Sequence, residues 1–457
     1  MKISIISVFP ELHERFIATS LIARAVEKNL ISFNLIKLSD MCAPKERIDE
    51  PTCGPGAGMI IKPEVIEKAI DTAETAFGLG YRIFFSPQGE LLTQPRIRQL
   101  ATELFDISGD ASPDIKTWQT ERASSQPVQP ITHLILVCSR YEGMDARVEQ
   151  YYAHKLISIG DYVLMGGDLP AQVFLEAILR LIPGIVGKNA SVEHDSFTGP
   201  LLDHPEYGLP TAWKDLIIPE VIRSGNHQLI NTWRRQEACK NTLYKRFDWF
   251  RAHNPSSEDK TLACSNIPSH YIVLMHDQVH LKHEGIGQTS IATLDIHDIA
   301  RSSATYGIKN YFIVSPMKDQ QTILKTFLDF WRSDDGKQYN ETRHRAISAV
   351  IPAFSLAEVI EHIQKIEKKD PIIISTSAKI ADHQVKIDYN SQGKIWSQER
   401  PVLFIFGTGQ GLSREVLDQS HYMLLPIQGL TDYNHLSVRA ATSIILDRWL
   451  GLNQRLE

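Results

Sequence analysis

Short apolar runs and longer amphipathic stretches alternate along the first part of the chain. Runs of about four to eight apolar residues are typical of buried strands, whereas apolar residues three or four apart are typical of helices. The predicted strands are 3–8, 30–36, 81–85 and 133–139, and the predicted helices are 11–28, 63–77, 94–104 and 171–181. Because strands that alternate with helices pair in parallel, we predict an α/β unit with a parallel sheet.

The same alternation returns in the last part of the chain. The predicted strands there are 271–275, 311–314, 345–351, 371–375 and 402–406, and a predicted helix at 436–450 follows them. No short repeat is visible in the sequence, so a second α/β unit explains the pattern better than a repeat array does.

Two segments between these units have a different pattern. Residues 106–130 are rich in Ser, Pro, Asp and Gln and lack periodic apolar positions, so we expect a mobile surface insertion. Residues 218–249 look purely helical, and a Ser-, Asn- and Asp-rich segment separates them from the last unit. We therefore predict an α/β domain at 1–195, a linker and small all-helical domain at 196–262, and a second α/β domain at 268–457.

Length and composition narrow the class of protein. The 457 residues are too many for one core at roughly 150 residues per domain. The 43% hydrophobic and 22% charged residues are typical of a soluble globular protein. The first residues become charged before a signal-peptide core could form, and no run reaches the roughly 18 apolar residues of a membrane span. We therefore expect a cytoplasmic protein.

Charge and cysteine content exclude further classes. The formal net charge of -6 argues against an indiscriminate binder of polyanions, although a folded surface can still assemble a local basic patch. The five cysteines are widely scattered and include no closely spaced pair. They predict neither a disulfide framework nor a structural zinc site, and we expect no metal-binding residues.

Three glycine-bearing loops follow predicted strands, at Ser86–Glu90, Ser139–Gly143 and Ser158–Pro170. Ligands of parallel sheets bind at such strand ends. Glycine lets a ligand approach the backbone closely, so N–H and C=O groups in these loops could recognise the edge of a heterocycle such as adenine. A single loop of this kind, taken alone, is better explained as a tight turn.

Two further features have a functional and a plain interpretation. A polar loop after Arg180 contains Glu193, His194 and Asp195, which suggests proton transfer, but such residues more often cap turns on the surface. Basic residues recur at roughly helical spacing in the helical stretch, where a solvated face is the plain interpretation. They are Arg234, Arg235, Lys240, Lys245 and Arg246.

The order of the motifs in the first part carries a family resemblance. The motifs are SPQG, RYEG, IGDYVLMGGDLPA, IPGIVG, EHDSF, LLDHPEYGLP and SGNHQLINTWR. Together they resemble the bacterial tRNA (guanine-N1)-methyltransferase family, TrmD, over residues 1 to about 250, interrupted by the polar insertion. The resemblance implies a SPOUT fold, in which a parallel sheet forms a deep trefoil knot. Sequence rules alone would never predict such a knot.

The resemblance also implies a reaction and its partners. The reaction is methyl transfer from S-adenosylmethionine to N1 of the guanosine on the 3′ side of the anticodon in tRNA. The enzyme would be a homodimer with a shared active site, and its helical domain would hold the tRNA through the basic residues named above. Magnesium is implied as well, although no ligand cluster in the sequence identifies it.

Three residues match catalytic positions of the family. Guanine N1 carries a proton near neutral pH, so a base has to remove this proton as the methyl group arrives. Asp195 matches that general base. Arg180 matches the residue that stabilises the charge developing on O6, and Glu142 would lie near the methyl group and the target base.

The resemblance assigns the cofactor site to the three glycine-bearing loops. The matching positions are Ser86, Pro87, Gln88, Ser139, Tyr141, Gly143, Ile159, Gly160, Asp161, Tyr162, Val163, Leu164, Gly166, Gly167 and Pro170. Two residues depart from the family pattern and leave the affinity for the cofactor open. Pro55 interrupts a glycine run and removes an N–H group, and Ser139 adds a side chain near the adenine site.

The last part of the chain contains VLFIFGTGQGLSREV, whose glycines lack the G-x-G-x-x-G spacing of a dinucleotide site. Residues 269–452 instead resemble predicted SPOUT-type RNA methyltransferases. That resemblance implies a second cofactor site at Gly407, Gly409, Gly411, Ile427, Gly429, His435, Leu436 and Ser437. Asn434 and Arg439 are candidates for contact with the substrate. A cofactor-free domain that serves dimerisation or RNA contact is the alternative.

The leading interpretation is therefore an enzyme, a tRNA guanine-N1 methyltransferase with a second RNA methyltransferase domain of unknown substrate. A different interpretation is an RNA-binding or scaffold protein that keeps a degenerate SPOUT fold. The catalytic positions favour the enzyme, whereas the changes at Pro55 and Ser139 keep the alternative open.

Overall fold

The computed structural model describes residues 1–55, 58–105, 132–186, 195–282, 285–380 and 384–453. The polar insertion predicted at 106–130 lies outside these residues. The chain divides into two compact units, Met1–Thr198 and Gly199–Glu457, and each is described by itself. No helix in the described part of the chain is long and apolar enough to cross a membrane.

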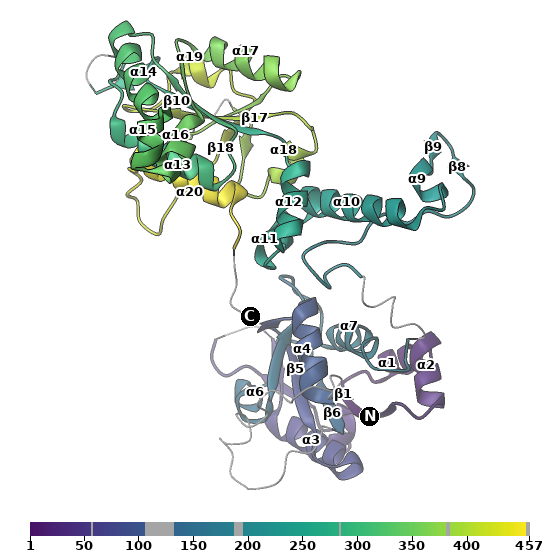
Figure 1. Cartoon of the computed structure of the whole chain (residues 1–457). Helices are drawn as coiled ribbons and strands as arrows, with labels where there is room; N and C mark the ends of the chain where they lie inside the picture. Colours follow the sequence, from purple (N-terminus) through teal and green to yellow (C-terminus); the bar gives the residue numbers. More distant parts are fainter. Residues whose placement is uncertain (56–57, 106–131, 187–194, 283–284, 381–383, 454–457) are drawn as a thin grey trace. The chain divides into compact units, whose positions relative to one another are not determined.

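The first unit is built on a five-stranded sheet with the order β2-β1-β6-β5-β7 (Figure 1). The strands are β1 (Lys2–Ser7), β2 (Ser32–Lys37), β5 (Tyr81–Leu91), β6 (His133–Val137) and β7 (Lys155–Ser158). Every neighbouring pair runs parallel, which confirms the parallel sheet expected from the alternation of strands and helices. The trefoil knot stays a prediction.

Helices cover both faces of this sheet, so the strands are buried on both sides. On one face lie α2 (Ser20–Glu27), α4 (Gln94–Phe105) and α7 (Asp168–Leu179), whose apolar side chains pack with Ile3, Ile5 and Leu136. On the other face lie α3 (Pro63–Phe77) and α6 (Ala146–Tyr152), which pack with Phe84 and Val137. Burial from both sides explains why β6 is a continuous apolar run rather than an alternating one.

Around this core, η1 (Leu38–Met41) follows β2, and β3 (Asp49–Pro51) pairs antiparallel with β4 (Met59–Ile61). The helix predicted as one stretch at 11–28 is two helices, α1 (Glu11–Ile17) and α2. Thr19 is extended and Ser20 has a positive φ of 49°. Short hydroxyl side chains suit helix ends better than helix interiors, which explains the break.

The second unit contains a seven-stranded sheet with the order β14-β13-β10-β17-β15-β18-β16. Its strands are β10 (His270–Met275), β13 (Asn310–Val314), β14 (Val350–Ala353), β15 (Ile372–Ser375), β16 (Lys386–Ile387), β17 (Val402–Gly407) and β18 (Tyr422–Leu424). All of its strand pairs are parallel, so the second α/β unit is confirmed. A separate antiparallel pair is formed by β11 (Val279–Leu281) and β12 (Gly285–Gly287).

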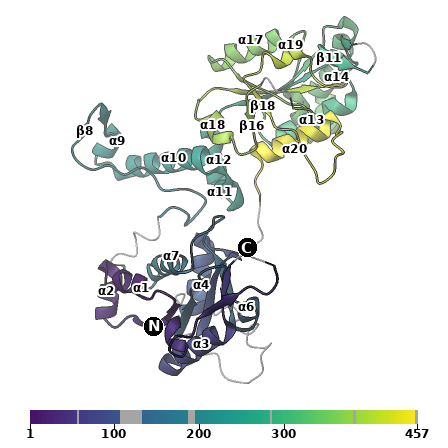
Figure 2. The same cartoon turned by 180° about the vertical axis from the view of Figure 1, so that it is seen from behind.

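Two groups of helices sandwich this second sheet (Figures 1 and 2). One face carries α13 (Thr293–Thr305), α14 (Lys318–Arg332), α16 (Glu341–Ser348) and α20 (Val438–Leu450). The other carries α17 (Leu356–Glu367) and α19 (Arg414–Leu417). Two further short helices of this unit are α15 (Asp334–Tyr339) and α18 (Gln392–Trp396).

The predicted strand at 345–351 is wrong in its first half, because α16 continues to Ser348. The Asn340 side chain accepts a hydrogen bond from the backbone N–H of Arg343 and so starts a helix there. Ala346 and Ile347 then face the core from a helix, and β14 begins only at Val350. The apolar run alone could not distinguish the two structures.

The middle segment is helical but is not one helix. A small hairpin of β8 (Ala212–Trp213) and β9 (Leu216–Ile217) precedes α9 (Glu220–Arg223), α10 (His227–Lys245) and α11 (Phe247–Ala252). The polar segment expected to separate this region from the last unit forms another helix, α12 (Ser257–Asn266). Ser256 and Asp259 form a capping box that starts it.

Candidate functional sites

The three glycine-bearing loops of the first unit lie at one edge of the sheet, because β6, β5 and β7 are neighbours and run parallel. Residues 86–89 lie inside β5, where the pairing with β7 shifts and both Phe85 and Glu90 pair with Ile157. A side chain on Gly89 would meet the Ile157 backbone at 2.5 Å, so only glycine fits there.

The other two loops are joined to each other at their glycines. Gly166 pairs with Arg140 as an isolated bridge, and the N–H of Gly167 donates to the carbonyl of Ser139 at 2.8 Å. A Cβ on Gly166 would lie 2.5 Å from the Arg140 side chain. The structure thus brings together the loops that the resemblance assigns to S-adenosylmethionine, and the Ser139 backbone is part of their junction.

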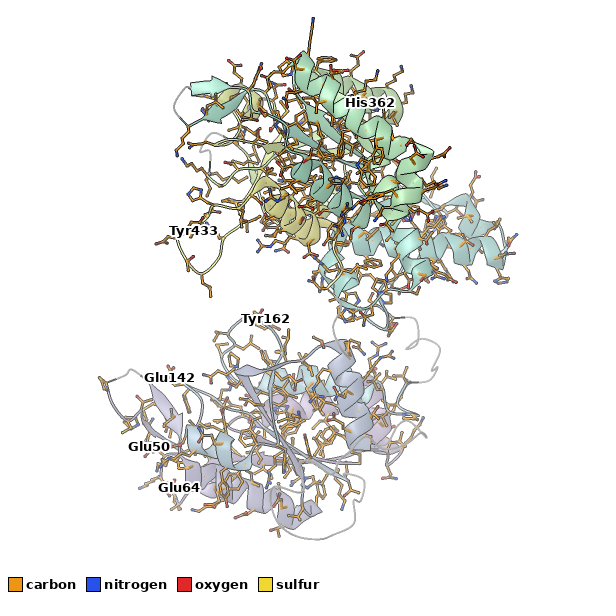
Figure 3. The ribbon with its side chains drawn as sticks, turned by 60° about the vertical axis from the view of Figure 1, so that its left-hand side comes forward. Glu50, Glu64, Glu142, Tyr162, His362 and Tyr433 are labelled. Atoms are coloured by element: carbon orange, nitrogen blue, oxygen red, sulfur yellow. The ribbon has the colours of Figure 1, made fainter. Side chains whose placement is uncertain are left out.

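Tyr141, Glu142 and Tyr162 project from these loops into solvent; Figure 3 labels the last two. The backbone N–H of Glu142 donates to the carbonyl of Met59 at 3.1 Å. Gly58 faces the Glu142 side chain so closely that a Cβ there would lie 2.3 Å from Cγ. Gly58, at the end of the glycine run that departs from the family pattern at Pro55, therefore packs against the Glu142 side chain.

A buried carboxylate that the sequence interpretation missed anchors these loops. Asp168 is 1% exposed and accepts hydrogen bonds from the Ser7 hydroxyl and from Arg140 Nε at 2.8 Å, while His13 Nε2 lies 3.1 Å from it. Burial acts to raise the pKa of Asp168, but the hydrogen bonds from His13 and Ser7 and the charge of Arg140 outweigh it and lower the pKa.

Asp168 also completes a cluster with His13 and Cys138 whose ligand atoms lie within 4.8 Å of one another. The Arg140 guanidinium already neutralises this carboxylate. A metal ion would have to displace it, and burial raises the pKa of the Cys138 thiol well above its usual value. The cluster therefore fits a structural role better than metal binding.

Arg180 and Asp195 form an ion pair at the end of α7. Arg180 is the C-terminal cap of that helix, a position that favours a cation. Asp195 begins a short turn in which the N–H and hydroxyl groups of Thr198 donate to its carbonyl. Both side chains remain partly exposed, at 46% and 39%. Glu193 and His194 lie outside the described residues.

Neither member of this pair is hydrogen-bonded or ion-paired to the glycine-bearing loops of its own chain, as far as the described residues go. The structure brings the Asp195 carboxylate together with the Arg180 guanidinium, and it separately brings the glycine-bearing loops together with one another. An active site that uses both sets has to assemble them.

Most of the basic residues proposed to contact RNA are ion-paired within the protein. Arg235 pairs with Asp259 at 2.9 Å, and Lys240 pairs with Glu399 at 2.7 Å, which raises the pKa of Lys240. Arg234 contacts Glu206, and Arg246 contacts Asp248. Lys245 has no ion pair with another described residue. Four of these five basic residues are therefore engaged in ion pairs, and Lys245 is not, within the described part of the chain.

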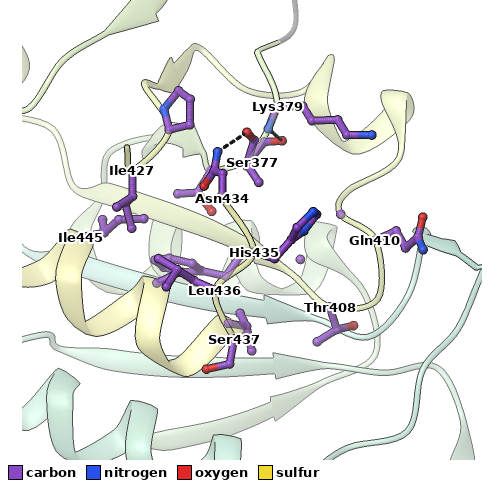
Figure 4. A pocket seen from close by; sticks show the side chains of 18 of the residues that line it. Ser377, Lys379, Thr408, Gln410, Ile427, Asn434, His435, Leu436, Ser437 and Ile445 are labelled. Atoms are coloured by element: carbon purple, nitrogen blue, oxygen red, sulfur yellow. Dashed lines mark hydrogen bonds between the residues drawn. The ribbon is translucent and has the colours of Figure 1, made fainter. Parts of the chain in front are cut away.

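The second unit has a pocket of about 600 Å³ at the ends of β15, β17 and β18 (Figure 4). A pocket of this size is in the range of cofactor sites. Of the residues that the resemblance assigns to this site, Gly429 alone does not line it; those that do are Gly407, Gly409, Gly411, Ile427, His435, Leu436 and Ser437. Gly409 has a positive φ of 59°, and a Cβ there would lie 2.7 Å from the carbonyl of His280.

Polar groups on the pocket wall come from distant parts of the sequence. Asn434 Nδ2 donates to the carbonyl of Ala378 at 2.9 Å, drawn as a dashed line in Figure 4. Asp295 at the start of α13 and Arg439 on α20 form an ion pair at 3.2 Å, and both line the pocket. Asp295 was missed in the sequence because 144 residues separate it from its partner.

Comparison with known proteins finds that both parts of the chain are similar to enzymes that methylate RNA. Residues 269–451 match a model of SAM-dependent RNA methyltransferases. Residues 1–106 and 115–252 match the model of tRNA (guanine-1)-methyltransferase TrmD. The parallel sheets and their glycine-lined edges therefore belong to a methyltransferase that depends on S-adenosylmethionine.

The chain belongs to the tRNA (guanine-N1)-methyltransferase family. It is 34% identical over 457 residues to the tRNA (guanine-N(1)-)-methyltransferase of Nitratidesulfovibrio vulgaris, and the alignment covers 99% of each chain. The corresponding protein of Oleidesulfovibrio alaskensis is 33% identical with the same coverage. That of Geobacillus kaustophilus is 36% identical over 250 residues, which is 54% of this chain and 91% of that one. The two-part organisation is thus shared with the first two relatives.

Proposed function

We propose that the first unit transfers a methyl group to N1 of the guanosine on the 3′ side of the anticodon in tRNA. The observation that carries the proposal is the ion pair between Arg180 and Asp195. In this pair a carboxylate and a guanidinium lie side by side and remain partly exposed, which supports the proposal that one substrate base contacts both. The family resemblance assigns Asp195 to removal of the proton from N1. It assigns Arg180 to stabilisation of the charge that develops on O6 of the same guanine ring.

S-adenosylmethionine supplies an electrophilic methyl group. As the bond from N1 to the methyl carbon forms and the carbon–sulfur bond breaks, Asp195 accepts the proton that N1 loses. Arg180 donates to O6, where negative charge develops, and its interaction strengthens as that charge grows. The guanine has to share Arg180 with Asp195, and the partial exposure of both side chains leaves room for this.

The glycine-bearing loops are the proposed cofactor site of this unit. Their glycines bring bare backbone groups to one edge of the sheet, which suits the adenine ring. Glu142 is fixed through its backbone to Met59 and leaves its carboxylate exposed, consistent with a place near the methyl group.

A homodimer is part of the proposal, and exposed apolar residues support it. Val163 is 84% exposed and Met165 is 89% exposed on the loop before α7, and Leu169 and Val173 are exposed on α7 itself. Exposed apolar residues that lie close together in the sequence support a protein interface in this segment. A partner would bring its own Arg180 and Asp195 to the loops of the first chain, which supplies the assembly that one chain lacks.

Transfer from labelled S-adenosylmethionine to unmodified tRNA transcripts tests the proposal. The full chain should form N1-methylguanosine, and Asp195→Ala should lower the rate by about 100-fold or more because it removes the general base. Asp203→Ala, which removes another loop carboxylate of the chain, serves as the matched control. Persistent product in Asp195→Ala would contradict the assigned base.

If the full chain binds tRNA but forms no product, the RNA-binding alternative is correct. Assays with and without EDTA check the magnesium requirement that the resemblance implies. Because the substrate is tRNA, the proposed location is the cytoplasm. Point variants are preferable to truncation after residue 262, since the helical segment shares its core with the rest of the second unit.

A further inference from the structure

The helical segment α9–α12 and the second methyltransferase domain share one hydrophobic core. Leu243, Phe247 and Phe250 pack in the same cluster as Trp396 and strands β10 and β17. The rings of Phe247 and Trp396 meet edge to face at 4.8 Å. A Cβ on Gly393 of α18 would lie 1.9 Å from the Tyr244 carbonyl, so α10 and α18 touch backbone to backbone. The two parts form one packed body.

Helix α20 links this junction to the second pocket. Its N-cap Ser437 lines the pocket, and its 13 residues span about 20 Å. At its far end, Arg251 of α11 donates to the carbonyls of Asp447 and Arg448 at 2.9 and 2.8 Å. Asn453 returns a backbone hydrogen bond to Arg251. An RNA bound to the helical segment is therefore held at a fixed distance from the second pocket.

The surface between the two parts is basic and hollow. A hollow of about 450 Å³ at the junction is lined by Lys245 of α10 and Lys394 of α18, together with Asn390 and Asp248. Neither lysine is ion-paired to another residue that the structure describes, whereas Asp248 is paired with Arg246. Two lysines from different parts of the unit, of which Lys394 also lies 5.5 Å from the centre of the Tyr422 ring, suit a continuous phosphate backbone.

The mouth of the second pocket has the groups that a nucleotide needs. Tyr433, which precedes the lining residues Asn434 and His435 but does not itself line the pocket, is 75% exposed and lies edge to face with His435 at 5.6 Å; Figure 3 labels it on its surface loop. Exposed aromatic rings stack on unpaired bases. Asp295 beside Arg439 repeats the combination of carboxylate and guanidinium found in the first unit.

We propose that the second site methylates tRNA, held by the helical segment that it shares with the first site, and that Asp295 accepts the proton. The bond from an N or O atom of a tRNA nucleotide to the methyl carbon forms as the carbon–sulfur bond breaks. Asp295 takes the proton of the acceptor, and S-adenosylhomocysteine leaves. This inference rests on the proposed function in one respect, that the helical segment binds tRNA.

The test uses the full chain with the first site silenced by Asp195→Ala. Labelled S-adenosylmethionine is offered with unmodified tRNA transcripts and, separately, with unmodified ribosomal RNA. We expect label in tRNA on a nucleoside other than N1-methylguanosine, lowered about 100-fold by adding Asp295→Asn while binding of S-adenosylmethionine is retained. No label in tRNA, or label in ribosomal RNA alone, overturns the proposal.

Lysine variants separate this inference from the proposed function. In chains with one active site, Lys394→Ala should raise the KM for tRNA at the second site by about threefold or more. Lys245→Ala should raise it at both. Lys325→Ala, an exposed lysine of α14 that lines neither hollow, is the matched control. Equal effects of Lys394→Ala and Lys325→Ala contradict a shared tRNA path, whereas failure of guanosine methylation alone contradicts only the first site.

Discussion

At the residue scale, two carboxylates with different environments organise the first unit. Asp195 is partly exposed and paired with one guanidinium, so it is available to a substrate. Asp168 is buried and accepts from Ser7, His13 and Arg140 together, so it positions other groups instead of reacting. Sequence alone could point to Asp195 through its motif. It could not point to Asp168, because 161 residues separate it from Ser7.

Replacing Asp168 with asparagine should disturb the glycine-bearing loops that form the proposed cofactor site of the first unit. Loss of one partner leaves Arg140 half-buried without its counter-ion, a change that costs roughly 3 to 5 kcal/mol in other proteins. We expect lower stability of the first unit in urea unfolding and weaker binding of S-adenosylmethionine, measured by calorimetry. Asp71→Asn on the exposed face of α3 is the matched control. Unchanged cofactor affinity in Asp168→Asn would show that the network does not position the loops.

At the element scale, the first residue of β10 is a buried histidine, His270, that connects this strand to α18 and α20 by hydrogen bonds. His270 Nδ1–H donates to the carbonyl of Pro268 at 2.6 Å, and its Nε2 accepts from the indole N–H groups of Trp396 and Trp449. An indole nitrogen can only donate, so Nε2 has to stay unprotonated. Burial lowers the pKa of His270 to about 4.

This arrangement predicts acid sensitivity of the second unit. The unfolded chain binds a proton near the ordinary pKa of 6.5, whereas the folded chain resists protonation down to about 4. Stability is therefore fully present above about pH 6.5 and falls between 6.5 and 4, by an amount on the order of 3 kcal/mol. The pKa of His276 is lowered to about 4 as well and adds to the same window.

Urea unfolding between pH 4 and 8 measures this dependence. His270→Gln, which keeps an acceptor for one indole but cannot be protonated, should flatten the slope in that window. A slope equal to that of the natural chain would show that His270 does not control it.

The elements themselves were largely predictable. The helix at 63–77 begins at a proline and shows clear apolar periodicity, and its observed bounds are those predicted. The errors lie where capping residues decide, as at Asn340 before α16 and Ser256 before α12. At both positions the composition of the segment suggested a strand or a linker, whereas a side-chain hydrogen bond at the N-cap favours a helix.

At the scale of the whole molecule, the chain combines two parallel-sheet units of RNA-methylating families. The alternation of strands and helices was enough to predict both sheets. The joining of α10–α12 to the second sheet was not, because the contacting side chains, such as Phe247 and Trp396, look like ordinary core residues of separate domains. The same integration underlies the proposed sharing of tRNA between the two sites.

The most direct test of the central claim maps the methyl group on the RNA. The full chain carrying Asp295→Asn, the substitution proposed to silence the second site, is incubated with S-adenosylmethionine and transcripts that have guanosine or adenosine on the 3′ side of the anticodon. Nucleoside mass spectrometry should find N1-methylguanosine at that position in the first transcript and no methylation in the second. A methyl group on another atom or position, or equal methylation of both transcripts, would contradict the account.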